Sequence, residues 1–280
     1  MTTTATTERV GGFDIPKLGL GMLGNHDEDA QRLAEAALAE GYRHIDTSEY
    51  YGNEVAVGRA IARSSVARED IWLTTKVLHP KAPVPPDARS AAEASLARLD
   101  VDYVDLLLIH WPNPLFDLEE TLAVFTALRD EGRARAIGVS NFPIELLREA
   151  LGYADHIVTD QVEYHPYIDQ SAILAEIRKA GLTLTAHSPL ARGKVNDDPL
   201  LKEIGAGHGL SAAQVALRWL IQQDRVIAIP GGKPDEVGQL KENVAVLDAA
   251  LTDDEMARIS ALAGDQVRIV DPPFAPAWDA

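Results

Sequence analysis

Four ionisable side chains stand at or just after the ends of short apolar runs in this sequence. Asp46 ends such a run after Gly41, Lys76 ends another, His110 ends a third, and Tyr51 lies five residues beyond Asp46. A charged group at the end of a buried strand is costly unless it is paired, because burial removes its water. In parallel α/β barrels the carboxyl ends of the strands carry the catalytic groups. We therefore predict that these four residues meet at one end of a parallel sheet.

Two of these residues, taken alone, also have a purely structural explanation. Asp46 could cap the segment that follows it, and Tyr51 could pack on the surface as an amphipathic side chain. All four together, placed at the ends of neighbouring strands, are harder to explain in that way.

The elements that would position these residues alternate along the chain. Strands are predicted from apolar runs at residues 18–21, 43–47, 71–76, 104–110, 136–140, 157–163, 182–187 and 226–230. Helices are predicted from the helical spacing of apolar side chains at residues 29–40, 54–62, 87–99, 119–131, 143–151, 169–180, 199–206 and 211–222. Eight strand–helix units predict an α/β protein with the architecture of a (β/α)8 TIM barrel.

The two ends of the chain are predicted to lie outside this alternation. Residues 1–9 are predicted to be a mobile tail, and residues 10–280 a single barrel domain that begins with a β-hairpin at residues 10–18. The short C-terminal tail at residues 271–278 is too rich in proline to be helical. It could fold over the barrel mouth, where its aromatic side chains would shape a pocket, or pack beside the barrel.

The segment around the first of these residues resembles a known family. Gly-Tyr-Arg-His-Ile-Asp-Thr at residues 41–47, followed by Tyr-Gly-Asn-Glu at residues 51–54, is similar to the signature of the aldo-keto reductases. The resemblance covers nearly the whole chain and is of the short bacterial type, similar to the 2,5-diketo-gluconate reductases. It implies a barrel plugged at its bottom by the hairpin, which reduces aldehydes or ketones to alcohols with NAD(P)H. It also implies that Asp46, Tyr51, Lys76 and His110 form the catalytic tetrad.

Carbonyl reduction gives the four residues separate roles in such an enzyme. Hydride reaches the carbonyl carbon from the nicotinamide, and a proton must reach the oxygen. Tyr51 is the predicted acid, and Lys76 is expected to lower its pKa from about 10 toward working pH. Asp46 would keep Lys76 charged, and a neutral His110 would align the carbonyl oxygen. Tyr50 is a rival for the acid role, but its spacing from Asp46 favours Tyr51.

The resemblance also assigns a cofactor site. Ser140, Asn141 and Gln161 match positions that hydrogen-bond the nicotinamide carboxamide, although Ser140 and Asn141 could instead, or also, cap the next helix. A loop over the pyrophosphate is implied at residues 188–194, where Arg192 and Lys194 supply positive charge. The cofactor positions implied besides the first three are Gly21, Met22, His187, Ser188, Pro189, Leu190, Lys194, Ile229, Gly231, Lys233, Gln239, Glu242 and Asn243.

Some cofactor positions depart from the family pattern. His187 stands where a large aromatic residue usually stacks on the nicotinamide, so stacking is expected to be weaker. Gly231 and Gln239 stand where a lysine and an arginine usually hold the 2′-phosphate, and Lys233 would have to reach back from a lengthened loop. NADPH is therefore the expected cofactor, and the incomplete clamp leaves NADH open as a second one.

The substrate pocket also departs from the pattern. Leu23 replaces an aromatic residue often found near the end of strand one, which would enlarge the pocket. Tyr50 and Trp111 are predicted to line the same pocket.

Composition bounds the remaining functions. A formal charge of −17 on 280 residues argues against nucleic acid and anionic membranes as partners. The sequence has no cysteine, no histidine spacing typical of zinc, no apolar run of the ~20 residues that span a bilayer, and no secretory signal. We therefore expect a cytoplasmic, metal-free monomer that acts on a small-molecule carbonyl substrate.

Two other classes of barrel stay open. A barrel that binds nicotinamide only to sense or regulate would be favoured by loss of a tetrad residue, and none is lost. A phosphate-binding lyase or isomerase would need a glycine-rich anion loop after the last two strands, where Gly231-Gly232 is a weak candidate.

Overall fold

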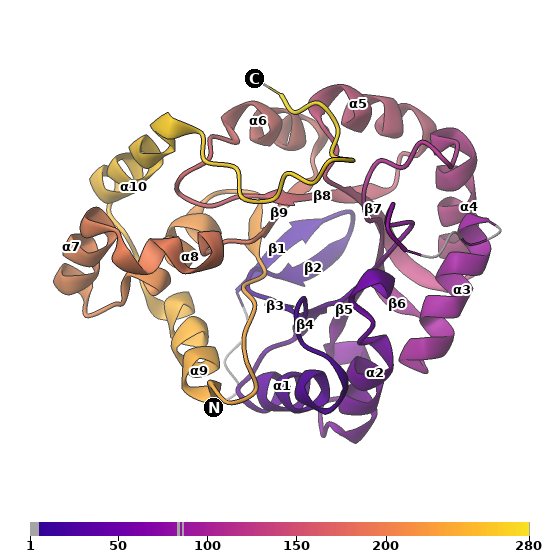
Figure 1. Cartoon of the computed structure of the whole chain (residues 1–280), viewed down its shortest axis with the longest axis horizontal. Helices are drawn as coiled ribbons and strands as arrows, with labels where there is room; N and C mark the ends of the chain where they lie inside the picture. The colour runs from indigo at the N-terminus through magenta and orange to yellow at the C-terminus, as the bar shows by residue number, and fades with distance from the viewer. Residues whose placement is uncertain (1–5, 83–84, 86, 280) are drawn as a thin grey trace.

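The computed structural model describes residues 6–82, 85 and 87–279 and is built around an eight-stranded parallel sheet. Each strand pairs with the next along the chain, and bridges from Leu18 to Ala228 and from Gly21 to Gly231 join the first strand to the last. The predicted (β/α)8 architecture is therefore confirmed (Figure 1). The strands are β3 (Leu20–Gly21), β4 (His44–Asp46), β5 (Trp72–Val77), β6 (Val104–Ile109), β7 (Ala134–Ser140), β8 (Ile157–Glu163), β9 (Thr183–His187) and β10 (Val226–Ala228).

Helices surround the sheet and cover its outer face (Figure 1). Their buried residues recur at helical spacing, as in Val215, Trp219 and Leu220 of one helix, so each helix presents an apolar stripe to the strands. The predicted ranges are found with small shifts at their ends. The helices are α1 (Asp27–Ala39), α2 (Glu54–Arg63), α3 (Ala88–Leu99), α4 (Leu118–Asp130), α5 (Ile144–Tyr153), α6 (Ser171–Ala180), α7 (Pro199–His208), α8 (Ala212–Gln222), α9 (Val237–Ala245) and α10 (Asp253–Ser260).

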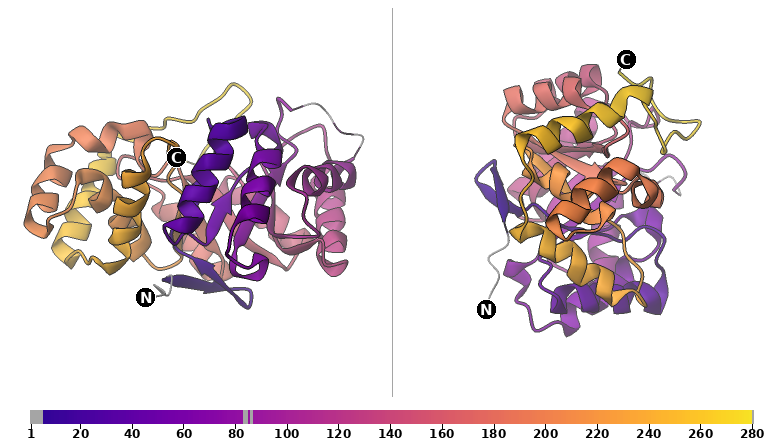
Figure 2. Two further views of the ribbon diagram at one scale, coloured as in Figure 1. Left: turned by 90° about the horizontal axis from the view of Figure 1, so that it is seen from below. Right: turned by 90° about the vertical axis from the view of Figure 1, so that its left-hand side faces the viewer.

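An N-terminal hairpin closes one end of the barrel. Its strands are β1 (Thr7–Val10) and β2 (Phe13–Pro16), and Val10 and Ile15 are buried in one cluster with side chains from the strands. Figure 2 shows the hairpin at the end opposite the C-terminal tail. The hairpin begins earlier than the sequence pattern indicates, so residues 7–9, predicted to be part of a mobile tail, are paired strand. Residues 1–5 of that predicted tail lie outside the described residues.

The C-terminal tail crosses the other end of the barrel (Figures 1 and 2). The carboxylate of Glu163 accepts hydrogen bonds from the backbone N–H groups of Ile269 at 2.6 Å and Val270 at 2.7 Å. Beyond this anchor the ring of Phe274 lies 5.3 Å from the ring of Trp111, centroid to centroid. Of the two positions left open by the sequence, the tail therefore takes the one over the mouth.

None of the helices within the described part of the chain is both long and apolar enough to cross a membrane.

Candidate active site

Neighbouring strand ends bring the predicted catalytic residues together. Asp46 ends β4, Lys76 lies near the end of β5, and His110 follows β6, with register Asp46 beside Thr74 and Lys76 beside Leu108. All three are buried, with Asp46 1% and Lys76 0% exposed. Because parallel strands end at the same edge, side chains far apart in sequence converge there.

Tyr51 reaches this group from a short 3₁₀ helix, η1 (Glu49–Tyr51). The Ser48 hydroxyl caps its start by accepting a hydrogen bond from the Tyr50 backbone N–H at 3.2 Å. Gly52 ends it in the left-handed region with φ 67°, a conformation that glycine adopts without strain. The turn therefore directs Tyr51 back over the ends of β4 and β5.

Lys76 is the centre of the buried network. Its ammonium donates to Asp46 Oδ1, to the Thr47 carbonyl oxygen at 3.0 Å and to Tyr51 Oη at 3.3 Å. Burial alone would lower the pKa of Lys76, but the charge of Asp46 and the hydrogen bonds to Asp46 and Tyr51 raise it above its ordinary value. Lys76 is therefore a cation with all three of its donors used.

The pKa of Tyr51 does not move as the sequence predicts. Burial raises it above 10.0, and the lowering by the Lys76 charge is outweighed by burial together with the nearby Asp46 carboxylate. Lys76 acts on this pKa in the expected direction, but the expected net fall of the pKa of Tyr51 toward working pH is wrong. Tyr51 is a neutral phenol whose hydroxyl proton is retained at neutral pH.

His110 lies across from Tyr51 as a neutral imidazole. The two ring centroids are 5.6 Å apart at 81°, and His110 Nδ1 is 2.8 Å from Ser48 Oγ. Burial, followed by the charge of Lys76, holds the pKa of His110 well below 6.5. An imidazole of this kind can donate or accept a hydrogen bond but carries no charge near neutral pH.

A cavity of about 880 Å³ opens above the tetrad and extends to the loops after β9 and β10. Lys76 lies beneath its floor and does not line it. The predicted site residues that line the cavity are Gly21, Leu23, Asp46, Tyr50, Tyr51, His110, Trp111, Ser140, Asn141, Gln161, His187, Ser188, Pro189, Leu190, Ile229, Gly231, Lys233 and Gln239.

Four residues predicted to contact the cofactor do not line the cavity. Met22 is buried in the core, and Asn243 is buried on α9. Glu242 is exposed on the same helix. The ammonium of Lys194 lies 5.0 Å from the centroid of the Tyr167 ring, whereas Arg192, two residues earlier, does line the cavity.

Polar side chains at or near the ends of β7, β8 and β9 form a connected group on the cavity wall. Asn141 Nδ2 donates to the His110 carbonyl oxygen and to Ser140 Oγ, both at 3.0 Å, and its Oδ1 lies 3.0 Å from His187 Nε2. Gln161 Nε2 donates to Asp46 Oδ2 at 2.8 Å. The alternative that Ser140 and Asn141 cap the next helix is wrong, because the N-cap of α5 is Pro143, without a side-chain cap.

The loop after β10 forms the far end of the cavity. Lys233 is exposed and pairs with Glu236, its Nζ 3.3 Å from Oε1. Lys233, Glu236 and Gln239 all line the cavity there, and Arg192 lines it from the loop after β9. The positive charge at this end is therefore partly offset by a carboxylate.

Aromatic side chains form the mouth. The rings of Tyr50 and His79 are stacked with centroids 3.6 Å apart, and His79 lies 5.3 Å from Phe274. Leu23 also lines the cavity, and its side chain is 63% exposed. Sequence reasoning missed His79, although it closely follows β5, the same kind of position that singled out His110. It also missed Glu163, because nothing local indicates a contact with a distant tail.

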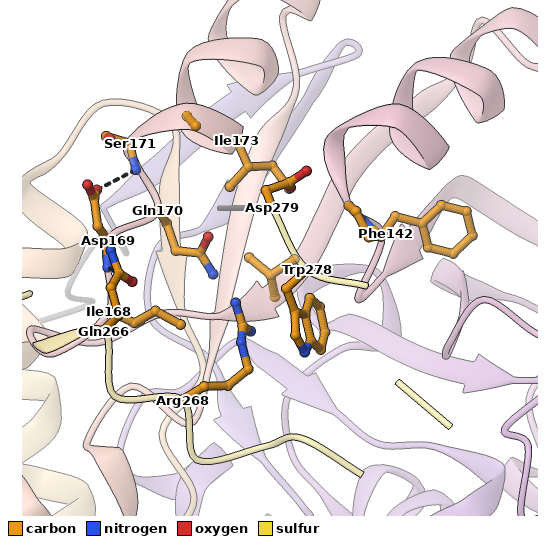
Figure 3. Close-up of a pocket in the computed structure, with 13 residues that line it drawn as sticks. Phe142, Ile168, Asp169, Gln170, Ser171, Ile173, Gln266, Arg268, Trp278 and Asp279 are labelled. Atoms are coloured by element: carbon orange, nitrogen blue, oxygen red, sulfur yellow. Dashed lines mark hydrogen bonds between the residues drawn. The ribbon is translucent and has the colours of Figure 1, made fainter. Parts of the chain in front are cut away.

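A second cavity, of about 280 Å³, lies outside the barrel mouth beneath the tail (Figure 3). Arg268 and Trp278 meet there, with the guanidinium carbon 3.9 Å from the ring centroid. No residue predicted from the sequence to belong to the site lines it. Among the described residues, no group of three or more histidine and carboxylate side chains is arranged to hold a metal ion.

Fold and site together define an α/β-barrel enzyme in which a tyrosine hydroxyl contacts a buried cation at the floor of a long cavity. The family model of the Aldo/keto reductase family matches residues 17–263. An aldo-keto reductase of Mycobacterium sp. (strain KMS) is 39% identical over 254 residues, which cover 90% of each chain. A morphine 6-dehydrogenase of Pseudomonas putida is 38% identical over 90% of this chain and 88% of its own.

Among solved structures, the chain is similar to one described as a "putative 2,5-diketo-D-gluconic acid reductase B". The two superpose with a TM-score of 0.93 at 43% identity, over 100% of this chain and 99% of the other. The chain therefore belongs to the aldo-keto reductase family. It is an NAD(P)H-dependent oxidoreductase of carbonyl compounds, as the resemblance in its sequence implies.

Proposed function

We propose that this chain reduces small aldehydes and ketones with Tyr51 as the proton donor. The observation that carries the proposal is the 3.3 Å contact between Tyr51 Oη and the buried ammonium of Lys76, at the floor of the cavity. A phenol beside a fixed cation can release its proton because the resulting phenolate is stabilised where it forms.

Reduction of a carbonyl to an alcohol needs one hydride at the carbon and one proton at the oxygen. A reduced nicotinamide held beside the tetrad by Ser140, Asn141 and Gln161 would supply a hydride to the carbonyl carbon, and the electrons of the carbonyl π bond would move to the oxygen. Tyr51 then gives its hydroxyl proton to that oxygen, and Lys76 stabilises the phenolate until it is reprotonated from solvent. Asp46 holds Lys76 in place, and His110 contacts the carbonyl oxygen from the other side. Burial raises the pKa of Tyr51, so the acid stays loaded with its proton at neutral pH.

The residues present fit a nicotinamide dinucleotide. Ser140, Asn141 and Gln161 present amide and hydroxyl groups beside the tetrad, where a carboxamide would be held. Gln239 lines the far end of the cavity from α9, whereas Asn243, one turn further along the same helix, is buried and does not line it.

Phosphate binding is proposed to rest on Arg192 instead of Lys194, because only Arg192 lines the cavity. For the 2′-phosphate we propose Lys233 as the binding residue. To bind the phosphate, Lys233 must break its ion pair with Glu236 or contact the carboxylate and the phosphate together. NADPH is therefore used with weak discrimination against NADH. A carboxylate beside the only lysine at this end of the described cavity opposes a doubly charged phosphate.

The mouth favours substrates with an apolar or aromatic arm. Tyr50, His79, Trp111 and Phe274 form a continuous aromatic wall. Leu23 adds an exposed apolar side chain to the lining of the same cavity. Flat groups stack on such walls at small entropic cost. The single domain over residues 10–280, the monomeric state and the cytoplasmic location stay predictions.

The proposal is tested by oxidation of NADPH and NADH with a panel of aromatic and aliphatic aldehydes, α-keto esters, diketones and keto-sugars. We expect reduction with both cofactors and the highest kcat/KM for carbonyls that carry an aromatic arm. Cofactor that binds without being oxidised by any member of the panel would favour a sensing barrel and contradict the proposal.

A further inference from the structure

Ser48 is a buried hydroxyl at the centre of the site whose role goes beyond capping η1. It is 0% exposed, and its Oγ lies 2.8 Å from His110 Nδ1 and 3.1 Å from the carbonyl oxygen of Lys76. The Tyr50 backbone N–H donates to the same oxygen at 3.2 Å. Ser48 therefore joins the backbone of the acid-bearing turn, the strand of the catalytic lysine and the ring of His110.

The hydrogen atoms around Ser48 allow two arrangements. A hydroxyl has one proton, and a neutral imidazole has one N–H. If Ser48 donates to the Lys76 carbonyl, then His110 Nδ1–H must donate to Ser48, and Nε2 is left as an acceptor. If Ser48 donates to His110 Nδ1 instead, the ring proton is on Nε2. The Ser48 hydroxyl and the His110 tautomer are therefore coupled.

Only one of these arrangements suits a carbonyl substrate. The His110 ring lines the cavity, and its Nε2 makes no hydrogen bond to the described residues. A carbonyl oxygen can only accept a hydrogen bond, so it is attracted by Nε2–H and repelled by a bare Nε2.

We propose that Ser48 is a positioning residue that donates to His110 Nδ1 and thereby presents Nε2–H to the oxygen of the substrate. This inference rests on the proposed function, because it assigns His110 an oxygen to contact. The low pKa of His110 supports it, since a protonated ring would carry both N–H groups and make the choice of tautomer irrelevant.

Because Ser48 can also donate to the Lys76 carbonyl oxygen, the tautomer of His110 depends on the ligand. In the empty site, donation by Ser48 to that carbonyl satisfies one more acceptor and favours a bare Nε2. A carbonyl substrate shifts the balance to Nε2–H, while the hydroxyl group of an alcohol can donate to a bare Nε2. The same serine thus lets one histidine serve both substrate and product.

A direct test is the tautomer of His110 in a ternary complex that cannot react. The enzyme is saturated with oxidised cofactor and with the ketone that it reduces fastest, and ¹⁵N shifts of the histidine rings are recorded, with His110→Gln to assign the signal. We expect His110 to be the Nε2–H tautomer in the wild type and a mixture of the Nε2–H and Nδ1–H tautomers in Ser48→Ala. An Nδ1–H tautomer in the wild type, or an unchanged Nε2–H tautomer in Ser48→Ala, overturns the assignment.

Kinetics separate this role from the capping of η1. We expect Ser48→Ala to lower kcat about tenfold, the effect of one hydrogen bond in the transition state, with unchanged cofactor affinity. Ser48→Cys keeps a weak hydrogen-bond donor, so its kcat should lie between the kcat of the wild type and that of Ser48→Ala. In a His110→Gln background Ser48→Ala should cost nothing further, whereas a capping role would cost the same in both backgrounds.

The two proposals fail differently. A wild-type enzyme that oxidises no cofactor with any ketone removes the proposed function and this inference with it. An active wild type whose Ser48→Ala variant is equally fast overturns the role of Ser48 alone.

Discussion

The two ends of the long cavity are built in different ways. At the tetrad end, Asp46 and Lys76 are buried and held by hydrogen bonds to each other and to the strands. At the far end, the side chain of Lys233 is 73% exposed on a loop, and its partner Glu236 is 46% exposed. Buried, mutually bonded groups keep one geometry, whereas exposed ion pairs are weak and screened by salt. The difference implies that the chemistry is fixed by the barrel, while cofactor choice is set by adjustable side chains.

The largest effect should follow from breaking the tetrad end at its centre. Lys76→Met leaves Asp46 as an uncompensated buried charge and Tyr51 without its cation, so we expect reduction to be abolished. Circular dichroism and thermal unfolding would report the accompanying loss of stability, about 3–5 kcal/mol for a broken buried pair. A folded Lys76→Met protein with wild-type rates would show that the tetrad is not the catalytic group.

Removal of the acid alone should have a large effect that is confined to chemistry. Tyr51→Phe keeps the ring and loses the hydroxyl, so we expect kcat to fall by a factor of about 10² or more with cofactor affinity unchanged. Tyr50→Phe is the matched control, and it should change mainly KM because Tyr50 belongs to the mouth. Full activity in Tyr51→Phe would move the acid role to Tyr50 or His110.

Loosening the tail should affect substrate binding and leave the tetrad end untouched. Glu163→Gln replaces an oxygen that accepts a backbone N–H of the tail with an amide that cannot accept it. We expect KM for the carbonyl to rise about tenfold, faster hydrogen exchange at Ile269 and Val270, and unchanged cofactor affinity. The control is Asp279→Asn, because Asp279 is also on the tail but accepts its hydrogen bond from the Ile144 backbone N–H at an exposed position. Unchanged KM together with increased exchange would show that the tail does not form the pocket.

The smallest effects should occur at the far end. Lys233→Ala should reduce the preference for NADPH over NADH by no more than about fivefold, and Glu236→Gln should increase it by a similar factor. Measuring kcat/KM for both cofactors at low and moderate salt tests this. Salt should make the effect of each substitution on the NADPH preference smaller, because it screens exposed charges. A wild-type preference above about a thousandfold, worth roughly 4 kcal/mol, would contradict the weak clamp.

The same contrast explains which features could be predicted from the sequence. The barrel and the convergence of Asp46, Lys76 and His110 follow from buried apolar runs and parallel pairing, which local patterns carry. The orientation of Lys194 does not, because Ala191, Arg192 and Gly193 turn the chain through positive φ and direct Arg192, not Lys194, toward the cavity.

Long-range contacts account for the remaining differences. Glu163 and the tail are separated by more than one hundred residues, so no local pattern indicates that the tail is tied over the mouth. The direction of the Tyr51 pKa depends on how burial and the Asp46 charge compare with Lys76, a balance that only the packed site reveals. His79 closely follows β5, and its position alone could have placed it in the site.

The most direct measurement of the central claim is transfer of deuterium from reduced cofactor labelled at the donating carbon. With a ketone from the panel, we expect deuterium at the carbinol carbon of the product, and the same label, formed at least about 10² times more slowly, with Tyr51→Phe. A product without deuterium, or labelled product formed equally fast by the variant, would contradict hydride transfer with Tyr51 as the acid.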